Sequence, residues 1–391
     1  MPIAPAHLLD SIPAARTARA AFNRAPVGNG PFRFVQYRQN DRWVFEANPD
    51  FPEALGGRPY LDRVVWRPIP DASAQVTELQ TGGVHIVLTP MAEQFTTIRD
   101  APGFRGIDKQ GRQFASVIWN GRVPPLDDAR VRRALGMAIN RQQIIDVLRA
   151  GFGTPAVGPI GPTHWAYDDS TEPLPYAPDS ARALLAVAGI EDRNNDGILE
   201  LPGGQPFEIE LKVPAGSVIN RDMGELVRGD LARIGVRITT RATDWGTLIG
   251  DFTHPDRRFQ AFLLGYEVDY RVNLYDLFHS GALGTPNQFA SYSNPRVDSL
   301  IDRVRLASTM DDARPVYAEI QRILRDEQPW SFLYYYPDLV LLSDRLQGVE
   351  MDDRGVLMTI RDWWVTGGSR SGPAQSDSGV RSQPRDSAPA Q

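Results

Sequence analysis

The stretch between residues 207 and 266 constrains the fold more than any other part of the chain. It holds a run of alternating apolar residues, a helical stripe, a second strand pattern and an unbroken apolar run. These residues are Phe207, Ile209, Leu211 and Val213; Met223, Leu226, Val227 and Leu231; Val236, Ile238 and Thr240; and residues 259–266. Alternation is typical of a half-buried strand, and an unbroken apolar run indicates a strand in the middle of a sheet. This order predicts an α/β fold.

Similar patterns continue on both sides of this stretch. Apolar segments around 32–37 and 43–45 flank a polar turn and predict a hairpin, with a third strand at 64–66 and another at 84–88. Helical spacing begins near Asp71, Asp127, Asn140 and Pro178, and Asp71 and Asn140 are residues of the N-cap type. The hydrophobic run at 332–342 is interpreted as a pair of strands. Together these elements predict a mixed sheet, without internal repeats.

Composition excludes several classes of protein. The 391 residues include no cysteine, so disulfides, iron–sulfur clusters, thiolate zinc sites and cysteine nucleophiles are excluded. Arginine is spread evenly and the 42 basic residues are outnumbered by 48 acidic ones, which leaves no nucleic-acid footprint. No apolar stretch approaches the roughly 18 residues of a membrane span.

The two ends of the chain carry weaker signals. Met1 is followed by neither a basic nor an apolar segment, so no signal peptide is visible. Residues 367–391 are dominated by small and polar residues, with Val380 as the only large aliphatic one. Such a segment cannot bury a core, and a disordered tail is predicted.

Catalytic motifs are scarce. The sequence from Gly151 to Ala156 has the spacing of a dinucleotide fingerprint, but it follows a helix and contains Pro155, which favours a helix-terminating turn. There is no Walker A sequence, no nucleophile elbow and no His-Glu-x-x-His pair. The five histidines are scattered, which favours isolated packing or surface roles and leaves open a metal site assembled by folding. They are His7, His85, His164, His254 and His279.

The segment from Asp192 to Glu200 resembles the first half of a calcium loop. Asp192, Asn194 and Asp196 have the required spacing, but the position where calcium needs a bidentate Glu is Gly203. A turn leading into the strand that starts at Phe207 is the favoured interpretation.

Aromatic residues gather near the ends of predicted elements, where they could line a ligand cleft or serve as ordinary core and rim residues. They are Trp119, Trp165, Tyr167, Trp245, Tyr266, Tyr270 and Tyr275. Asp269 stands just after the buried-looking strand, between Val268 and Tyr270. A carboxylate at a strand end among aromatics is a candidate partner for a ligand cation, and a solvated turn Asp is the alternative.

A series of motifs resembles one protein family, the solute-binding proteins of bacterial ABC importers for dipeptides, oligopeptides and nickel (family 5). The resemblance runs from about residue 5 to 366 in a specific order and spacing. It rests on Val27-Gly-Asn-Gly-Pro-Phe-Arg-Phe34, Glu46-Ala-Asn-Pro-Asp-Phe51, Gly57-Arg-Pro-Tyr-Leu-Asp62, Ile69-Pro-Asp71, Pro125-Leu-Asp-Asp-Ala-Arg-Val-Arg-Arg-Ala-Leu135, Ala138-Ile-Asn140, Asp244-Trp245, Gly265-Tyr-Glu-Val-Asp-Tyr270, Tyr292-Ser-Asn-Pro-Arg-Val-Asp298 and Gln328-Pro329.

The resemblance implies a periplasmic-binding-protein-like α/β fold of class II, in which two lobes close on a ligand like a flytrap. The match begins in the middle of the family pattern, so the first lobe is expected to be incomplete at its N-terminus, with Met1 an internal methionine of a longer protein. Residues 1–115 correspond to the last part of the first lobe, 116–345 to the second lobe and 346–366 to the return into the first, before the tail at 367–391.

The resemblance also implies site residues. Asp269 matches the acid that receives a peptide α-ammonium, Trp245 an aromatic of the side-chain pockets, and Tyr266 replaces a usual tryptophan. Trp119 and Asn120 match the start of the second lobe, where ligand contacts occur, and Tyr270 lies beside the acid. Some relatives carry an arginine for the ligand carboxylate on the preceding strand, but here that strand reads Phe262-Leu263-Leu264.

The implied function is the extracytoplasmic, non-catalytic subunit of an ABC importer that binds peptides and delivers them to membrane permease subunits. The expected location is the periplasm or the outer face of the membrane, and the expected state is a monomer without cofactor, metal or nucleic acid. Three alternatives stay open: the same fold with a nickel chelate, an opine or an oligosaccharide as ligand; a peptide hydrolase; and a non-functional gene fragment.

Overall fold

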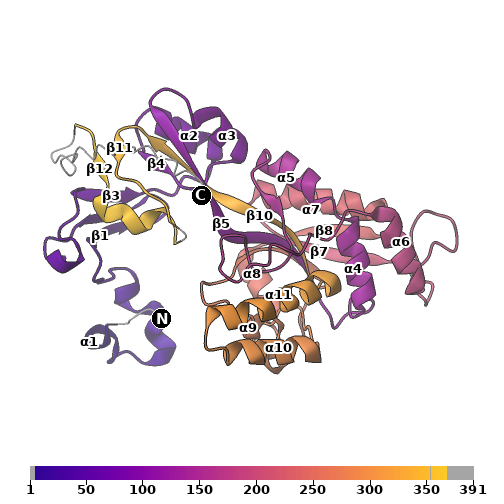
Figure 1. The fold of residues 1–391 in the computed structure, drawn as a ribbon. Coiled ribbons are helices and arrows are strands. Elements are labelled where there is room, and N and C mark those ends of the chain that lie inside the picture. The colour runs from indigo at the N-terminus through magenta and orange to yellow at the C-terminus, as the bar shows by residue number, and fades with distance from the viewer. Residues whose placement is uncertain (1–4, 353, 368–391) are drawn as a thin grey trace, which may run out of the picture. The chain divides into compact units, whose positions relative to one another are not determined.

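A computed structural model describes residues 5–352 and 354–367 (Figure 1). The chain divides into two compact units. The smaller unit contains the residues up to Val87, Pro102–Arg105 and those from Leu342 on, and the larger unit contains Leu88–Ala101 and Gly106–Leu341. The predicted lobe boundaries at residues 115 and 345 stay a prediction, and the predicted tail lies outside the described residues except for Gly367. Within the described ranges no helix is long and apolar enough to cross a membrane.

The smaller unit contains a three-stranded antiparallel sheet in the order β1-β2-β3. The predicted hairpin and third strand are therefore confirmed, and Asn40 at the hairpin turn has the left-handed φ of 57° that Asn tolerates. The elements of this unit are α1 (Ala6–Leu9), β1 (Phe32–Arg38), β2 (Arg42–Ala47), β3 (Arg63–Trp66), α2 (Ala72–Gln80), β4 (Ile86–Val87), β11 (Leu346–Gln347) and β12 (Trp364–Val365). The strand predicted at 84–88 is shorter than expected, because β4 contains only Ile86 and Val87.

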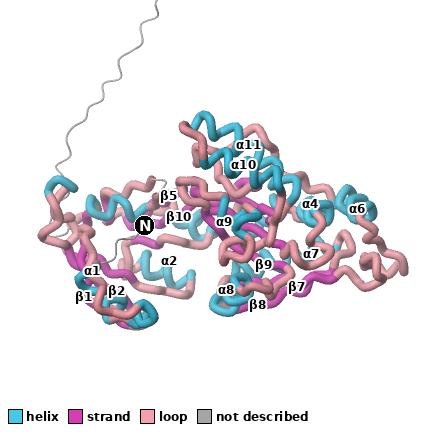
Figure 2. The backbone as a smooth tube through the Cα atoms, turned by 90° about the horizontal axis from the view of Figure 1, so that it is seen from below, coloured by secondary structure: helices cyan, strands magenta, loops and turns pink. Residues whose placement is uncertain are grey.

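The larger unit is built on a mixed sheet in the order β10-β5-β9-β7-β8. Its strands are β5 (Phe104–Trp119), β6 (Thr154–Pro155), β7 (Glu208–Pro214), β8 (Arg237–Thr243), β9 (Ala261–Glu267) and β10 (Trp330–Ser343), of which β5 and β10 reach the smaller unit at one end. Strand β7 is parallel to both β8 and β9, and β5 runs antiparallel to β9. Figure 2 shows β7, β8 and β9 side by side. The apolar run at 259–266 therefore forms a central strand, as predicted.

Helices cover both faces of this sheet. Along β5 the side chains alternate between two cores, with Phe114 and Ile118 in one and Val117 and Trp119 in the other. The first core is completed by α8 (Trp245–Thr253), α9 (Tyr275–Phe278), α10 (Pro295–Arg305) and α11 (Met310–Glu327). The second is completed by α4 (Ala129–Ala138), α5 (Arg141–Arg149), α6 (Pro178–Val187) and α7 (Val218–Ala232), and α3 (Ala92–Ile98) also belongs to this unit. The result is a three-layer α/β/α unit.

The predicted helix starts are confirmed by their caps. Asp71 accepts a hydrogen bond from the backbone N–H of Ala74 at 2.7 Å, and Asn140 accepts one from Gln143 at 3.1 Å. Each cap satisfies an N–H that has no partner within its own helix. After α5 the chain turns through Ala150 and Gly151, both with positive φ, so the dinucleotide-like spacing is a helix-terminating turn as interpreted.

The interpretation of residues 332–342 as a strand pair is wrong. The segment forms one continuous strand, β10, from Trp330 to Ser343. No residue of this strand has the left-handed backbone that a tight hairpin turn requires. Residues of both its halves are buried, and it lies beside β5, where the N–H of Trp119 donates to the carbonyl of Pro329 just before the strand.

Candidate functional site

The parallel strands of the larger unit place three loops at one edge of the sheet. These loops follow β7, β8 and β9. Together with the strand and helix residues that bound them they comprise residues 214–217, 243–245 and 267–275, and we call these segments the carboxyl edge. In open α/β sheets, ligands bind outside the carboxyl ends of the strands. Trp245 follows β8 and Asp269 follows β9. The fold therefore brings two of the predicted site residues to the edge where a ligand is expected.

Asp269 lies in a tight turn that leaves its carboxylate exposed. One carboxylate oxygen, Oδ1, accepts a hydrogen bond from the N–H of Arg271 at 2.9 Å, and the carbonyl accepts one from the N–H of Val272 at 3.0 Å. No cation of the described residues lies within ion-pair distance of it. Arg112 on the neighbouring strand is 2.5 Å from Glu267. The Asp269 carboxylate thus retains free acceptor capacity.

Side chains from outside the turn hold its backbone. The ring Nε2 of His164 lies 3.1 Å from the carbonyl oxygen of Tyr270, and the indole N–H of Trp165 donates to the same oxygen at 3.4 Å. The hydroxyl of Tyr317 donates to the carbonyl of Val272 at 3.1 Å. The turn is therefore fixed at two carbonyls, so the carboxylate is held in place rather than ordered by the ligand.

The surroundings of the turn shift two pKa values in opposite directions. Burial, together with the nearby Asp269 charge, raises the pKa of Tyr317 to about 12. Burial lowers the pKa of His164 against smaller opposing effects from Tyr270 and Asp269. At neutral pH the imidazole of His164 is therefore uncharged. Its Nδ1 accepts from the N–H of Ala166 at 3.2 Å, so the proton sits on Nε2, facing the Tyr270 carbonyl.

An aromatic cluster connects Trp245 to Tyr266. Trp245 is 53% exposed and packs edge-on against Phe252, with ring centroids 6.5 Å apart. Phe252 packs against Phe289 at 4.9 Å, and Phe289 lies 6.3 Å from Tyr266. The exposed ring of Trp245 is therefore backed by buried aromatics and presents a rigid apolar surface. Tyr270 is 58% exposed and adds a second ring beside Asp269.

Trp119 and Asn120 lie elsewhere. Trp119 pairs with Ala261, the first residue of β9, whereas Asp269 lies beyond its last residue, Glu267. The two ends of β9 are six residue steps apart, which corresponds to about 20 Å. The structure therefore does not bring these two residues to the edge that carries Asp269.

Both of these residues are buried, and their hydrogen bonds are made within the chain. The Asn120 amide donates to the carbonyls of Arg257 and Phe259 at 3.1 and 2.7 Å, and its oxygen accepts from the N–H of Arg122. The Trp119 indole donates to Ser331 Oγ at 2.9 Å. Both are 1% exposed, and these bonds join the end of β5 to the segment before β9 and to β10.

Sequence reasoning missed His164 and Tyr317, which hold the Asp269 turn. His164 carried one signal, its position directly before Trp165, a candidate aromatic in a loop. Tyr317 carried none, since it follows Val316 in a helical stripe and reads as an ordinary core residue.

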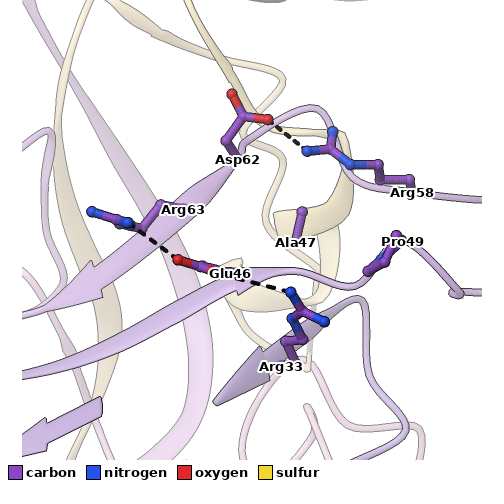
Figure 3. Close-up of a pocket in the computed structure, with 7 residues that line it drawn as sticks. All are labelled: Arg33, Glu46, Ala47, Pro49, Arg58, Asp62 and Arg63. Atoms are coloured by element: carbon purple, nitrogen blue, oxygen red, sulfur yellow. Dashed lines mark hydrogen bonds and ion pairs between the residues drawn. The ribbon is translucent and has the colours of Figure 1, made fainter. Parts of the chain in front are cut away.

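A cavity in the smaller unit is lined mainly by charged residues (Figure 3). It has a volume of about 510 Å³. Glu46 lies between Arg33 and Arg63, at 3.8 and 3.1 Å, and Arg58 pairs with Asp62 at 2.6 Å. Because each arginine is within ion-pair distance of a carboxylate, none of the three is free of an acidic neighbour for a ligand to replace.

Three carboxylates meet in the loop between α6 and β7. The oxygens of Asp192, Asp196 and Glu200 lie within 4.8 Å of one another. The loop is held by its own hydrogen bonds, including one from the N–H of Gly197 to Asp192 Oδ2 at 2.9 Å. It leads into β7, as the interpretation as a turn predicted.

Comparison with known proteins identifies the family. The family model of the bacterial extracellular solute-binding proteins, family 5 (middle), matches residues 1–282. The chain belongs to this family. It is 30% identical over 366 residues to the oligopeptide-binding protein AppA of Bacillus subtilis, covering 93% of this chain and 66% of that protein. It is 28% identical over 331 residues to the heme-binding protein A of Haemophilus influenzae, covering 83% of this chain and 57% of that protein.

A solved family 5 structure gives the same fold. The structure of AppA from Bacillus subtilis in complex with a nonapeptide superposes with a TM-score of 0.83 at 29% identity, covering 93% of this chain and 72% of that one. The predicted periplasmic-binding-protein-like α/β class is thereby confirmed. The family 5 chain spans 66% of the length of the Bacillus subtilis protein and 55% of the length of di/tripeptide-binding protein 1 of Pseudomonas aeruginosa.

Proposed function

We propose that this family 5 chain is the substrate-binding part of an ABC importer and binds peptides through their free amino terminus. The observation that carries the proposal is the Asp269 carboxylate, exposed at the carboxyl edge and without a cation of its own among the residues described. An ammonium group carries three donors and pairs well with a fixed carboxylate. The names of the curated relatives, oligopeptide-binding and di/tripeptide-binding proteins, support a peptide as the ligand.

The aromatic rings suit the rest of such a ligand. Trp245 and Tyr270 offer apolar faces to side chains of varied size, because stacking and apolar contact require no fixed hydrogen-bond pattern. A binding site for varied peptides needs strong recognition of the common backbone ends and tolerant contacts elsewhere. In this proposal Asp269 recognises the amino terminus, and the tolerant contacts come from Trp245, Tyr266 and Tyr270.

The proposal includes no catalysis, an extracytoplasmic location and delivery to membrane permease subunits. A peptide hydrolase would need a nucleophile with a base or a metal-bound water next to the ligand. The side chains that hydrogen-bond to the backbone of the Asp269 turn are two aromatic residues and a neutral histidine whose two nitrogens are both engaged by backbone groups. The family description, extracellular solute-binding proteins, supports the location.

Calorimetric titration tests the proposal with a tripeptide and its N-acetylated form. We expect the wild-type chain to prefer the free amine and Asp269→Asn to lose this preference, with affinity for the free-amine peptide falling roughly tenfold or more. Asparagine keeps the size and the oxygen that accepts from Arg271, so the turn is retained. Asp100→Asn, an equally conservative change at a side chain that is 86% exposed, serves as the matched control.

Two outcomes would overturn the proposal. Equal affinity of wild type and Asp269→Asn for the free-amine peptide would remove Asp269 from the site. Mass spectrometry of the peptide after prolonged incubation separates a binder from an enzyme, and cleavage fragments that accumulate with time would replace the proposal by the hydrolase alternative.

A further inference from the structure

A separate pocket adjoins the loop that carries Asp269. It has a volume of about 240 Å³ and lies between residues 271–275 of that loop, α10 and α11. Its walls include the buried side chains of Val272, Leu274 and Ile301. The volume suits one amino-acid side chain together with its backbone group.

The rim of this pocket is cationic. Arg271 and Arg305 both line it. Arg271 has no acidic partner among the described residues. The guanidinium of Arg305 stacks on the ring of Tyr275 at 4.8 Å and is 3.8 Å from Asp302, an exposed and loosely held pair. Arginine presents a planar fork of donors that matches a carboxylate. Apolar walls below two arginines therefore favour a ligand that is apolar and carries a carboxylate.

Backbone strain fixes the pocket and the Asp269 carboxylate together. Val272 has a φ of 51°, an unusual conformation for a β-branched residue. It is held there by the Tyr317 hydroxyl on its carbonyl and by its own N–H on the Asp269 carbonyl. Because Asp269 and Arg271 lie two residues apart in one turn, the fold fixes the separation of their backbones. Strain of this kind is typical of binding and catalytic loops.

We propose that this pocket is a second recognition subsite, in which Arg271, assisted by Arg305, binds the free α-carboxylate of an apolar C-terminal residue. As a subsite for peptides the inference rests on the proposed function. A short zwitterionic peptide would then be recognised at both ends by one loop, its ammonium at Asp269 and its carboxylate at Arg271.

Small probes test the pocket without using Asp269. Ligand-observed NMR of the full chain is recorded with N-acetyl-L-leucine, which has the carboxylate and no ammonium, and with N-acetyl-L-leucinamide, which has neither. We expect the acid to bind more tightly than the amide. Arg271→Gln should reduce binding of the acid roughly tenfold. Arg303→Gln, at an exposed arginine of α10 outside the pocket, is the matched control and should leave binding of the acid unchanged.

Each outcome of this experiment either supports or overturns the proposed subsite. Equal signals from the acid and the amide, no signal from either, or binding of the acid that Arg271→Gln leaves unchanged would overturn the subsite. Loss of binding in Arg303→Gln to the same degree would show non-specific attraction of an anion and would also overturn it. None of these results concerns the preference for a free amine, so the subsite and the proposed peptide function fail separately.

Discussion

A polar and an aromatic residue lie near each end of strand β9, and the two pairs have opposite roles. At its start, Asn120 and Trp119 are buried, and their polar groups hydrogen-bond to the chain itself. At its end, Asp269 and Tyr270 are exposed, and the carboxylate retains acceptor capacity. Polar groups that are saturated inside the protein stabilise the fold, and only groups with unused hydrogen-bonding capacity recognise a ligand. We therefore expect changes at the first end to affect folding and changes at the second to affect binding.

The largest effect is expected from Asn120→Ala. The change would leave the carbonyls of Arg257 and Phe259 buried without the donor that now satisfies them, and the free energy of unfolding should fall by about 2–4 kcal/mol. Chemical denaturation followed by tryptophan fluorescence measures this loss. Asn287→Ala, at an exposed asparagine, is the control, and Asp269→Asn should unfold like the wild type. A stability loss in Asp269→Asn that equals the loss in Asn120→Ala would remove the contrast between the two ends.

A smaller effect, on binding alone, is expected from Trp245→Ala. Its ring is half exposed, so the midpoint of unfolding should barely move, whereas peptide affinity should fall by a factor of about five through loss of aromatic contact. Trp245→Phe keeps a flat ring and should restore most of the affinity. The comparison of these two variants by titration calorimetry separates loss of an aromatic surface from damage to α8. Unchanged affinity in Trp245→Ala would exclude Trp245 from the ligand surface.

The smallest effect concerns pH. Burial lowers the pKa of His164 in the folded chain, so the unfolded chain binds a proton more readily. Stability from this group is therefore present above the unfolded pKa of about 6.5 and is lost as pH falls below it. Melting temperatures between pH 7 and 5 should fall less in His164→Gln than in the wild type. His85, whose pKa is also lowered by burial, gives the control His85→Gln, in which the His164 contribution persists. Identical pH profiles for the wild type and His164→Gln would contradict a difference in the pKa of His164 between the folded and unfolded chains.

The sequence contained enough to predict the edge that carries Asp269. The unbroken apolar run before it identified a central strand, and the first polar residues after such a strand lie at the edge of the sheet. Trp245 was accessible to the same reasoning, because it follows Asp244, the N-cap of α8, at the end of a parallel strand. Local patterns are informative here since strand ends and caps depend on neighbouring residues.

The role of Asn120 could not be predicted in this way. Its partners, Arg257 and Phe259, are more than 130 residues away, and the strand that covers Trp119 begins after Pro329. Burial of a polar side chain depends on which distant strands pair, and periodicity does not contain that information. The mistaken strand pair at 332–342 has the same origin, because the length of β10 depends on pairing with other strands rather than on its own residues.

Hydrogen exchange measured with and without a saturating tripeptide tests the central claim most directly. The account predicts slower exchange of the backbone amides at residues 245–247 and 268–272 when peptide is bound, with residues 119–122 unchanged. The N-acetylated peptide, at the same concentration, should produce little protection. Protection confined to residues 119–122, or no change at 268–272 with the peptide bound, would contradict the assignment of the ligand site to the Asp269 end of the sheet.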